Sequence, residues 1–138
     1  MSTRLNPYIN FKDDAREAMT FYHSVFGGDL QIRTFSEFQA SNDPAEADKV
    51  MHSQLETPDG FTLMASDTPN SMGYAGQEGF AVTVNGDEEE KLRGYWEALS
   101  EGGTVVVPYE VAPWGATFGM CVDRFGTNWM ISYAAEPV

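Results

Sequence analysis

Residues 123–132, DRFGTNWMIS, decide the fold of this chain because residues 59–66, DGFTLMAS, repeat their pattern. Gly60 aligns with Gly126, and the positions that follow pair Leu63 with Trp129, Met64 with Met130, Ala65 with Ile131 and Ser66 with Ser132. In both stretches a turn glycine is followed by residues that alternate between two faces, as a half-buried strand requires. We therefore predict that one turn and strand occur twice.

A helical pattern is also repeated, at an offset of 74 residues. Apolar residues recur at helical spacing in both halves: Ala18, Phe21, Tyr22, Val25 and Phe26 in the first, and Leu92, Tyr95, Trp96 and Leu99 in the second. Both patterns end at two glycines, and Gly28 aligns with Gly102. Acidic pairs with the spacing of a capping box precede them: Asp14 with Glu17, and Asp87 with Glu90. We predict one amphipathic helix in each half.

Other short alternating stretches predict the remaining strands. They cover residues 4–11, 30–35, 50–56, 80–84, 104–107, 118–122 and 127–133. A long polar loop, residues 37–48, separates two strands of the first half. The predicted fold is α+β: a single domain of two tandem βαβββ modules, about 4–66 and 79–134, joined by a linker at 67–78. The modules form a curved mixed sheet with the helices on its outer face.

Composition excludes several classes of function. The 138 residues carry a net charge of −13, which repels a phosphate backbone, so we expect no nucleic-acid partner. No apolar run approaches the roughly 18 residues of a membrane span. Cys121 has no partner cysteine, and the N-terminal residues lack the apolar core of a secretory signal. We expect a cytoplasmic protein without a membrane partner.

Short motifs occur in a distinctive order along nearly the whole chain. They are PYINF at 7–11, AMTFY at 18–22 with FGG at 26–28, VMH at 50–52, LM at 63–64 with Asp67, WG at 114–115 before FG at 118–119, and DRFG at 123–126 with WMI at 129–131. With the internal repeat, they resemble the vicinal-oxygen-chelate superfamily, which contains glyoxalase I, bleomycin-resistance proteins and extradiol dioxygenases. Within it, the PhnB-like branch is the most similar.

The resemblance implies four positions for metal ligands, which metal-using members fill with His or Glu. In this chain they fall on Asn6, Met64, Phe80 and Met130. Zn²⁺, Ni²⁺ and Fe²⁺ prefer imidazole nitrogen or carboxylate oxygen, whereas phenylalanine offers no ligand and a thioether is a poor one. We therefore expect no metal cofactor.

His52 is the candidate catalytic residue. Alternation along residues 50–56 places it on one face with Gln54 and Glu56. It either hydrogen-bonds a ligand or transfers a proton in a pocket, or it caps a buried backbone group. Two other residues are not candidates: His23 lies off the apolar stripe of its helix, and Cys121 has the position of a small buried thiol.

Alternation, anchored by the repeat, also predicts a cavity lining. Besides His52, the expected ligand-binding residues are Gln54, Met64, Phe80, Trp114, Phe118, Met120, Asn128 and Met130. Leu63, Trp129 and Ile131 then face the helices. Trp114 and Tyr109 are either walls of the pocket or core residues, and the methionines either line the cavity or fill the core. The cavity should be mostly apolar and should disfavour phosphate, since no Lys or Arg lies on these faces.

Two functions follow from this reading. The first is a metal-free protein that binds a small, partly aromatic molecule in the sheet cavity, as bleomycin-resistance relatives do. The alternative is an enzyme of the superfamily, a lyase, isomerase or dioxygenase-like protein, that uses His52 or a displaced metal site. We discount methyl transfer, which names of related proteins suggest, because the chain lacks the Gly-rich strand-to-helix turn that holds S-adenosylmethionine in the common methyltransferase fold. We also expect a homodimer that completes the cavity.

Overall fold

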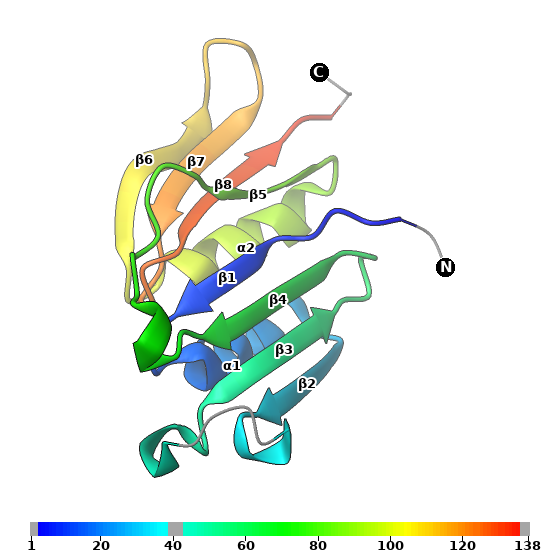
Figure 1. Ribbon diagram of the computed structural model, residues 1–138. Coiled ribbons are helices and arrows are strands. Elements are labelled where there is room, and N and C mark those ends of the chain that lie inside the picture. The colour runs from blue at the N-terminus through cyan, green and yellow to red at the C-terminus, as the bar shows by residue number, and fades with distance from the viewer. Residues whose placement is uncertain (1–2, 39–42, 136–138) are drawn as a thin grey trace. The chain divides into compact units, whose positions relative to one another are not determined.

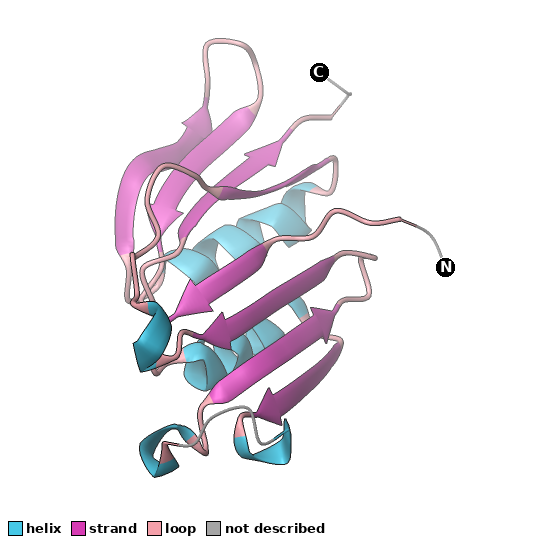
Figure 2. Ribbon diagram, viewed as in Figure 1, coloured by secondary structure: helices cyan, strands magenta, loops and turns pink. Residues whose placement is uncertain are grey.

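The computed structural model describes residues 3–38 and 43–135 (Figure 1). The chain forms two compact units, residues 1–76 and 77–138. The boundary between them falls within the predicted linker, residues 67–78. Each unit contains four strands and one long helix (Figure 2).

The first unit is a βαβββ module. Its elements are β1 (Tyr8–Phe11), α1 (Ala15–Phe26), β2 (Asp29–Thr34), β3 (Val50–Glu56) and β4 (Thr62–Asp67), with short 3₁₀ turns at Ser36–Phe38, Pro44–Glu46 and Asn70–Met72. The sheet has the order β1-β4-β3-β2, in which β1 is parallel to β4 and the other pairs are antiparallel. The helix α1 covers one face of this sheet (Figure 1).

The second unit repeats this topology. Its elements are β5 (Val82–Gly86), α2 (Glu89–Ser100), β6 (Thr104–Val111), β7 (Thr117–Val122) and β8 (Asn128–Tyr133). The order is β5-β8-β7-β6, again with the first strand parallel to the last. The predicted α+β fold of two βαβββ modules is confirmed, as two mixed sheets of four strands each.

Each core lies between a helix and one face of its sheet. In the first unit, Leu63 and Ala65 of β4 are buried while Met64 between them is half-buried. In the second unit, Trp129 and Ile131 of β8 are buried while Met130 is half-buried. This is the alternation that the repeated pattern predicts. Because each unit has one long helix, which packs on one face of the sheet, the second face has no long helix of its own unit.

The predicted capping boxes are wrong. Asp14 is the N-cap of α1, but its side chain makes no capping hydrogen bond. In the second unit the N-cap is Glu88 rather than Asp87, and its side chain also makes none. Burial raises the pKa of the Asp14 carboxyl, which disfavours the charged form that a capping acid uses.

The start of α1 is capped instead by Asp67, the last residue of β4, which is 3% exposed. Its Oδ1 accepts a hydrogen bond from the backbone N–H of Ala15 at 2.9 Å, and its Oδ2 accepts one from Val50 at 2.9 Å. Ala15 begins α1 and Val50 begins β3. One carboxylate thus joins three elements, and it satisfies a helix N–H that has no partner inside the helix.

Two glycines allow a close approach between backbones. A Cβ on Gly28, which follows α1, would lie 1.9 Å from the carbonyl oxygen of Glu56. A Cβ on Gly103, which follows α2, would lie 2.1 Å from that of Val122. The structural equivalent of Gly28 is therefore Gly103. The alignment of the helical patterns, which pairs Gly28 with Gly102, is wrong by one residue.

Several strand ends differ from the prediction. β1 begins at Tyr8 rather than at residue 4, and Leu5 is 99% exposed. β5 begins at Val82 rather than at residue 80. β6 continues through Pro108 to Val111, which the sheet edge permits because an edge strand tolerates a missing N–H. Within the predicted loop 37–48, residues 39–42 lie outside the described part of the chain.

Candidate functional site

The uncovered face of the first sheet carries three of the predicted site residues. Gln54 of β3 lies directly opposite Met64 of β4, and Met64 is paired on its other side with Tyr8 of β1. His52 lies two residues before Gln54 on the same strand, and all three predicted residues are half-buried. The structure therefore brings His52, Gln54 and Met64 onto one face, while their role in binding stays a prediction.

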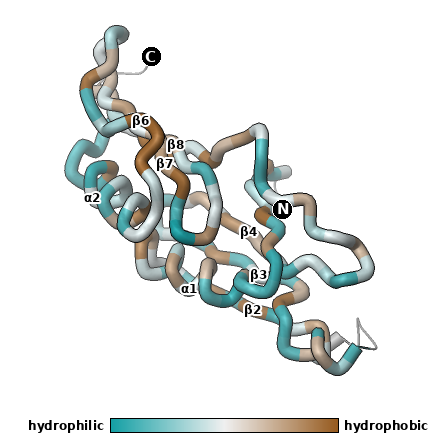
Figure 3. The backbone as a smooth tube through the Cα atoms, turned by 90° about the vertical axis from the view of Figure 1, so that its left-hand side faces the viewer, coloured by the Kyte–Doolittle hydropathy of each residue, from teal (hydrophilic) through white to brown (hydrophobic). Residues whose placement is uncertain are grey.

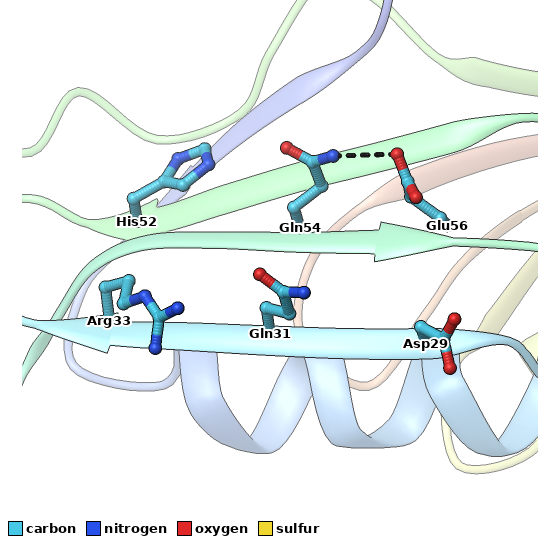
Figure 4. Close-up of a pocket in the computed structure, with 6 residues that line it drawn as sticks. All are labelled: Asp29, Gln31, Arg33, His52, Gln54 and Glu56. Atoms are coloured by element: carbon cyan, nitrogen blue, oxygen red, sulfur yellow. Dashed lines mark hydrogen bonds between the residues drawn. The ribbon is translucent and has the colours of Figure 1, made fainter.

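A groove of about 160 Å³ runs along β2 and β3 on this face (Figure 4). Its lining is polar, and the six residues form three directly opposed pairs: Asp29 with Glu56, Gln31 with Gln54, and Arg33 with His52. Each pair contributes one side chain from each strand. A polar groove of this kind differs from the mostly apolar cavity that the sequence predicts.

His52 has a side-chain partner across the sheet. Its Nδ1 lies 3.2 Å from the hydroxyl of Tyr8, and the two rings stack with their centroids 5.7 Å apart. The histidine therefore does not cap a buried backbone group through this nitrogen. The Tyr8 hydroxyl orients the imidazole and fixes which nitrogen takes part in the contact.

Arg33 overturns the expectation that no Lys or Arg lies on these faces. It is exposed, lines the groove and pairs with His52. Alternation along residues 30–35 already separates Gln31 and Arg33 from Leu30 and Ile32, which is a signal that sequence reasoning left unused. Gln31 was missed for the same reason, whereas Tyr8 and Asp29 lie outside this stretch.

The other end of the groove is acidic. Asp29 and Glu56 lie directly opposite each other, an arrangement that repulsion between like charges destabilises. Glu56 accepts a hydrogen bond from Gln54 at 3.0 Å, and it lies 3.8 Å from the Arg4 guanidinium. The charges of the groove are thus separated, with a basic end at Arg33 and an acidic end at Asp29.

The uncovered face of the second sheet is more apolar. Met120 lies opposite Met130, and Phe118 lies opposite Ser132. Asn128 is half-buried and donates a hydrogen bond to the Gln77 carbonyl at 3.4 Å. Hydrophobic residues extend along β6 and β7 (Figure 3). Phe118, Met120, Asn128 and Met130 therefore belong to one unit, and His52, Gln54 and Met64 to the other.

The two remaining predicted aromatic residues lie outside the strands. Phe80 precedes β5 and is 51% exposed, while Trp114 is in the turn between β6 and β7 and is 62% exposed. The Trp114 ring packs edge-on against Phe118, with their centroids 5.7 Å apart. Tyr109 instead stacks on Trp96 of α2 at 5.4 Å, so its ring packs against the helix.

Cys121 and His23 have the structural positions expected of them. Cys121 is buried, and burial raises the pKa of its thiol to about 11, which leaves little thiolate near neutral pH. His23 is exposed, and its Nε2 lies 2.8 Å from the carbonyl oxygen of Gly28 just after α1. Neither residue lines the groove.

The residues at the implied metal positions do not fit a metal centre. Asn6 and Met64 belong to the first unit, and Phe80 and Met130 to the second. None of these four side chains has an imidazole or a carboxylate. In the described ranges 3–38 and 43–135, no group of three or more His, Cys, Asp or Glu side chains is placed to hold a metal ion.

The two βαβββ units, each with an uncovered sheet face, have the fold expected from the resemblance to the vicinal-oxygen-chelate superfamily. Residues 3–132 match the family described as 3-demethylubiquinone-9 3-methyltransferase, and the chain belongs to that family, whose members include PhnB-like proteins. Of the helices in the described part of the chain, none has the length and apolar character that crossing a membrane requires.

Solved structures support the same assignment. Protein PA1353 from Pseudomonas aeruginosa is 38% identical, with a TM-score of 0.82, and the match covers 96% of this chain and 98% of that one. A PhnB protein from Bacillus cereus is 22% identical, with a TM-score of 0.74 and coverage of 96% and 100%. A glyoxalase-related enzyme from Fulvimarina pelagi is 20% identical, with a TM-score of 0.61 and coverage of 96% and 89%. The likeness to the last two shows the fold alone.

Proposed function

We propose that this protein binds a small, partly aromatic molecule in a cavity on an uncovered sheet face, without the metal usual in the vicinal-oxygen-chelate superfamily. The observation that carries the proposal is the groove on the first sheet, where six hydrogen-bonding side chains converge on a volume of about 160 Å³. Ligand sites generally combine a concave surface with a few polar groups that fix orientation. On the second sheet, the half-buried Phe118, Met120 and Met130 form a separate apolar surface.

One observation favours the alternative, an enzyme of the superfamily that uses His52. The Tyr8 hydroxyl holds the imidazole through Nδ1, as a residue that orients an acid or base would. Mass spectrometry of a bound ligand after prolonged incubation separates the two functions. A binding protein returns the ligand unchanged, whereas an enzyme converts it and loses this conversion in His52→Ala. We do not propose methyl transfer, because a similar fold alone does not establish an activity.

Ligand binding is testable by thermal shift with a panel of metabolites, because a ligand that binds only the native state raises its stability. We expect the affinity of a stabilising compound to fall by about 1–3 kcal/mol in His52→Ala or Gln54→Ala if the replaced side chain makes a buried hydrogen bond to the compound. Titration calorimetry measures this change. A compound that binds instead at the second sheet, beside Phe118, should quench the fluorescence of the exposed Trp114.

His23→Ala is the matched control, since His23 is the second histidine of the chain and lies outside the groove. It should leave affinity unchanged. Trp114→Phe should remove the fluorescence response without removing binding. A tight ligand that is unaffected by changes at His52, Gln54, Trp114 and Met130 alike would show that the site is elsewhere.

We further propose that the protein is a homodimer in solution. Each unit has one helix for two sheet faces, and several large apolar side chains outside the cores are exposed, among them Phe80, Val106 and Val111. Burial of such surface between subunits is favourable. Light scattering at micromolar concentration should give about twice the mass of one chain. The mass of a single chain under these conditions would contradict the proposal.

A further inference from the structure

The groove on the first sheet separates its charges along the strand direction. Arg33 and Asp29 are four residues apart on β2, a distance of about 13 Å along an extended strand. Charges exposed to solvent are screened beyond roughly 8 Å at physiological ionic strength. The basic end at Arg33 and the acidic end at Asp29 therefore act on different parts of a ligand.

Arg33 differs from the other four arginines of the chain in its contacts. Arg4 and Arg93 lie beside carboxylates, and Arg16 and Arg124 donate to backbone carbonyls. Among the residues that the structure describes, the Arg33 guanidinium has neither an ion pair nor a hydrogen bond.

The cross-strand neighbour of Arg33 offers a second polar group on the same face. His52 lies directly opposite, and its contact with Tyr8 occupies Nδ1, which leaves Nε2 for a ligand. A guanidinium binds carboxylate oxygens in a bidentate manner, and in the tautomer whose Nδ1 accepts from the Tyr8 hydroxyl, Nε2–H of His52 adds a further donor. Arg33 is the only permanent positive charge of the groove's six residues, which favours an anion with a single charge.

The rest of the groove limits the remainder of the ligand. Gln31 and Gln54 face each other in the middle and present neutral amides. At the far end, Glu56 lies beside the Arg4 guanidinium, and Asp29 repels a second anionic group. A volume of about 160 Å³ is below the usual range for sites that hold drug-sized ligands, so the molecule is small.

We propose that the Arg33–His52 end of the groove binds the carboxylate of a small organic acid with a single negative charge. This inference rests on the proposed function, and it adds the chemical class of the ligand. The carboxylate lies against Arg33 and Nε2 of His52, and the uncharged part of the acid extends towards Gln31 and Gln54.

The test is an NMR titration of ¹⁵N-labelled protein with phenylacetate and with phenylacetamide, which has the same shape and no charge. We expect phenylacetate to shift the resonances of Arg33, His52 and Gln54 and to bind about tenfold more tightly than the amide. Arg33→Gln should remove this preference. Arg16→Gln, which removes the same charge on the exposed surface of α1, should retain it.

Each other outcome has a defined meaning. If both compounds shift the groove resonances with equal affinity, the carboxylate site is wrong and ligand binding in the groove stands. If phenylacetate shifts resonances elsewhere or none at all, the inference is overturned, and the metabolite screen still decides the proposed function. Inorganic phosphate that binds at Arg33 as tightly as phenylacetate would contradict the preference for a single charge. Arg33 is exposed, so its replacement should leave the melting temperature unchanged.

Discussion

Replacement of Asp67 by alanine is expected to lower the free energy of unfolding of the first unit by about 4 kcal/mol. The carboxylate is buried and accepts one hydrogen bond from the N–H of Ala15 and one from the N–H of Val50. Without it, both N–H groups stay buried without an acceptor, at roughly 1–3 kcal/mol each. The loss of a cap at the start of α1 adds to this effect.

Chemical denaturation measures the change, and two variants serve as controls. Asp67→Asn keeps one acceptor oxygen and should lose about half as much stability as Asp67→Ala. Asp29→Ala removes an exposed carboxylate with the same loss of charge, and it should change stability by less than about 0.5 kcal/mol. An effect of Asp67→Ala below about 1 kcal/mol would show that water replaces the carboxylate at both N–H groups.

Gly28→Ala is the second change with a large expected effect. The new Cβ would lie 1.9 Å from the Glu56 carbonyl oxygen, and the φ angle of 98° is itself unfavourable for alanine. Neither backbone segment can move without breaking the pairing of β2 with β3, which joins Asp29 to Glu56. We expect a loss of about 4 kcal/mol or more, or failure to fold.

Two other glycines separate the causes of this loss. Gly60 has a φ of 91° and no atom within 4 Å of the added Cβ, so Gly60→Ala should lose only about 1–2 kcal/mol. In Gly103→Ala the Cβ would lie 2.1 Å from the Val122 carbonyl oxygen, so steric overlap should destabilise this variant as it does Gly28→Ala. If Gly28→Ala and Gly60→Ala have equal effects on denaturation midpoints, steric overlap at Gly28 is not the cause.

The sequence predicts the two modules well because the signal is local and occurs twice. Leu63 and Trp129 are buried while Met64 and Met130 are half-buried, as strict alternation requires. The helix caps show the limit of this approach. The spacing of Asp14 and Glu17 favours a local cap, but the acceptor for Ala15 comes from Asp67, which is distant in sequence and adjacent only after β4 pairs with β1.

The candidate site was predictable in part for a similar reason. His52 and Gln54 share a face by alternation within one strand. The position of Arg33 opposite His52 depends on the register between β2 and β3, which a long loop connects. Local sequence does not fix the register across such a loop, so the charged end of the groove becomes visible only in three dimensions.

From the parallel pairing of the first strand with the last, we also expect a particular order of assembly for each sheet. β1 leaves the ribosome before any other element of its unit, yet its partner β4 is the last strand of that unit to be synthesised. The antiparallel neighbours β2, β3 and β4 follow one another along the chain and can pair early, whereas β1 waits for a distant partner. The same delay applies to β5 and β8. Until then Ile9 and Phe11 remain exposed, and the nascent chain is most prone to aggregation during this interval.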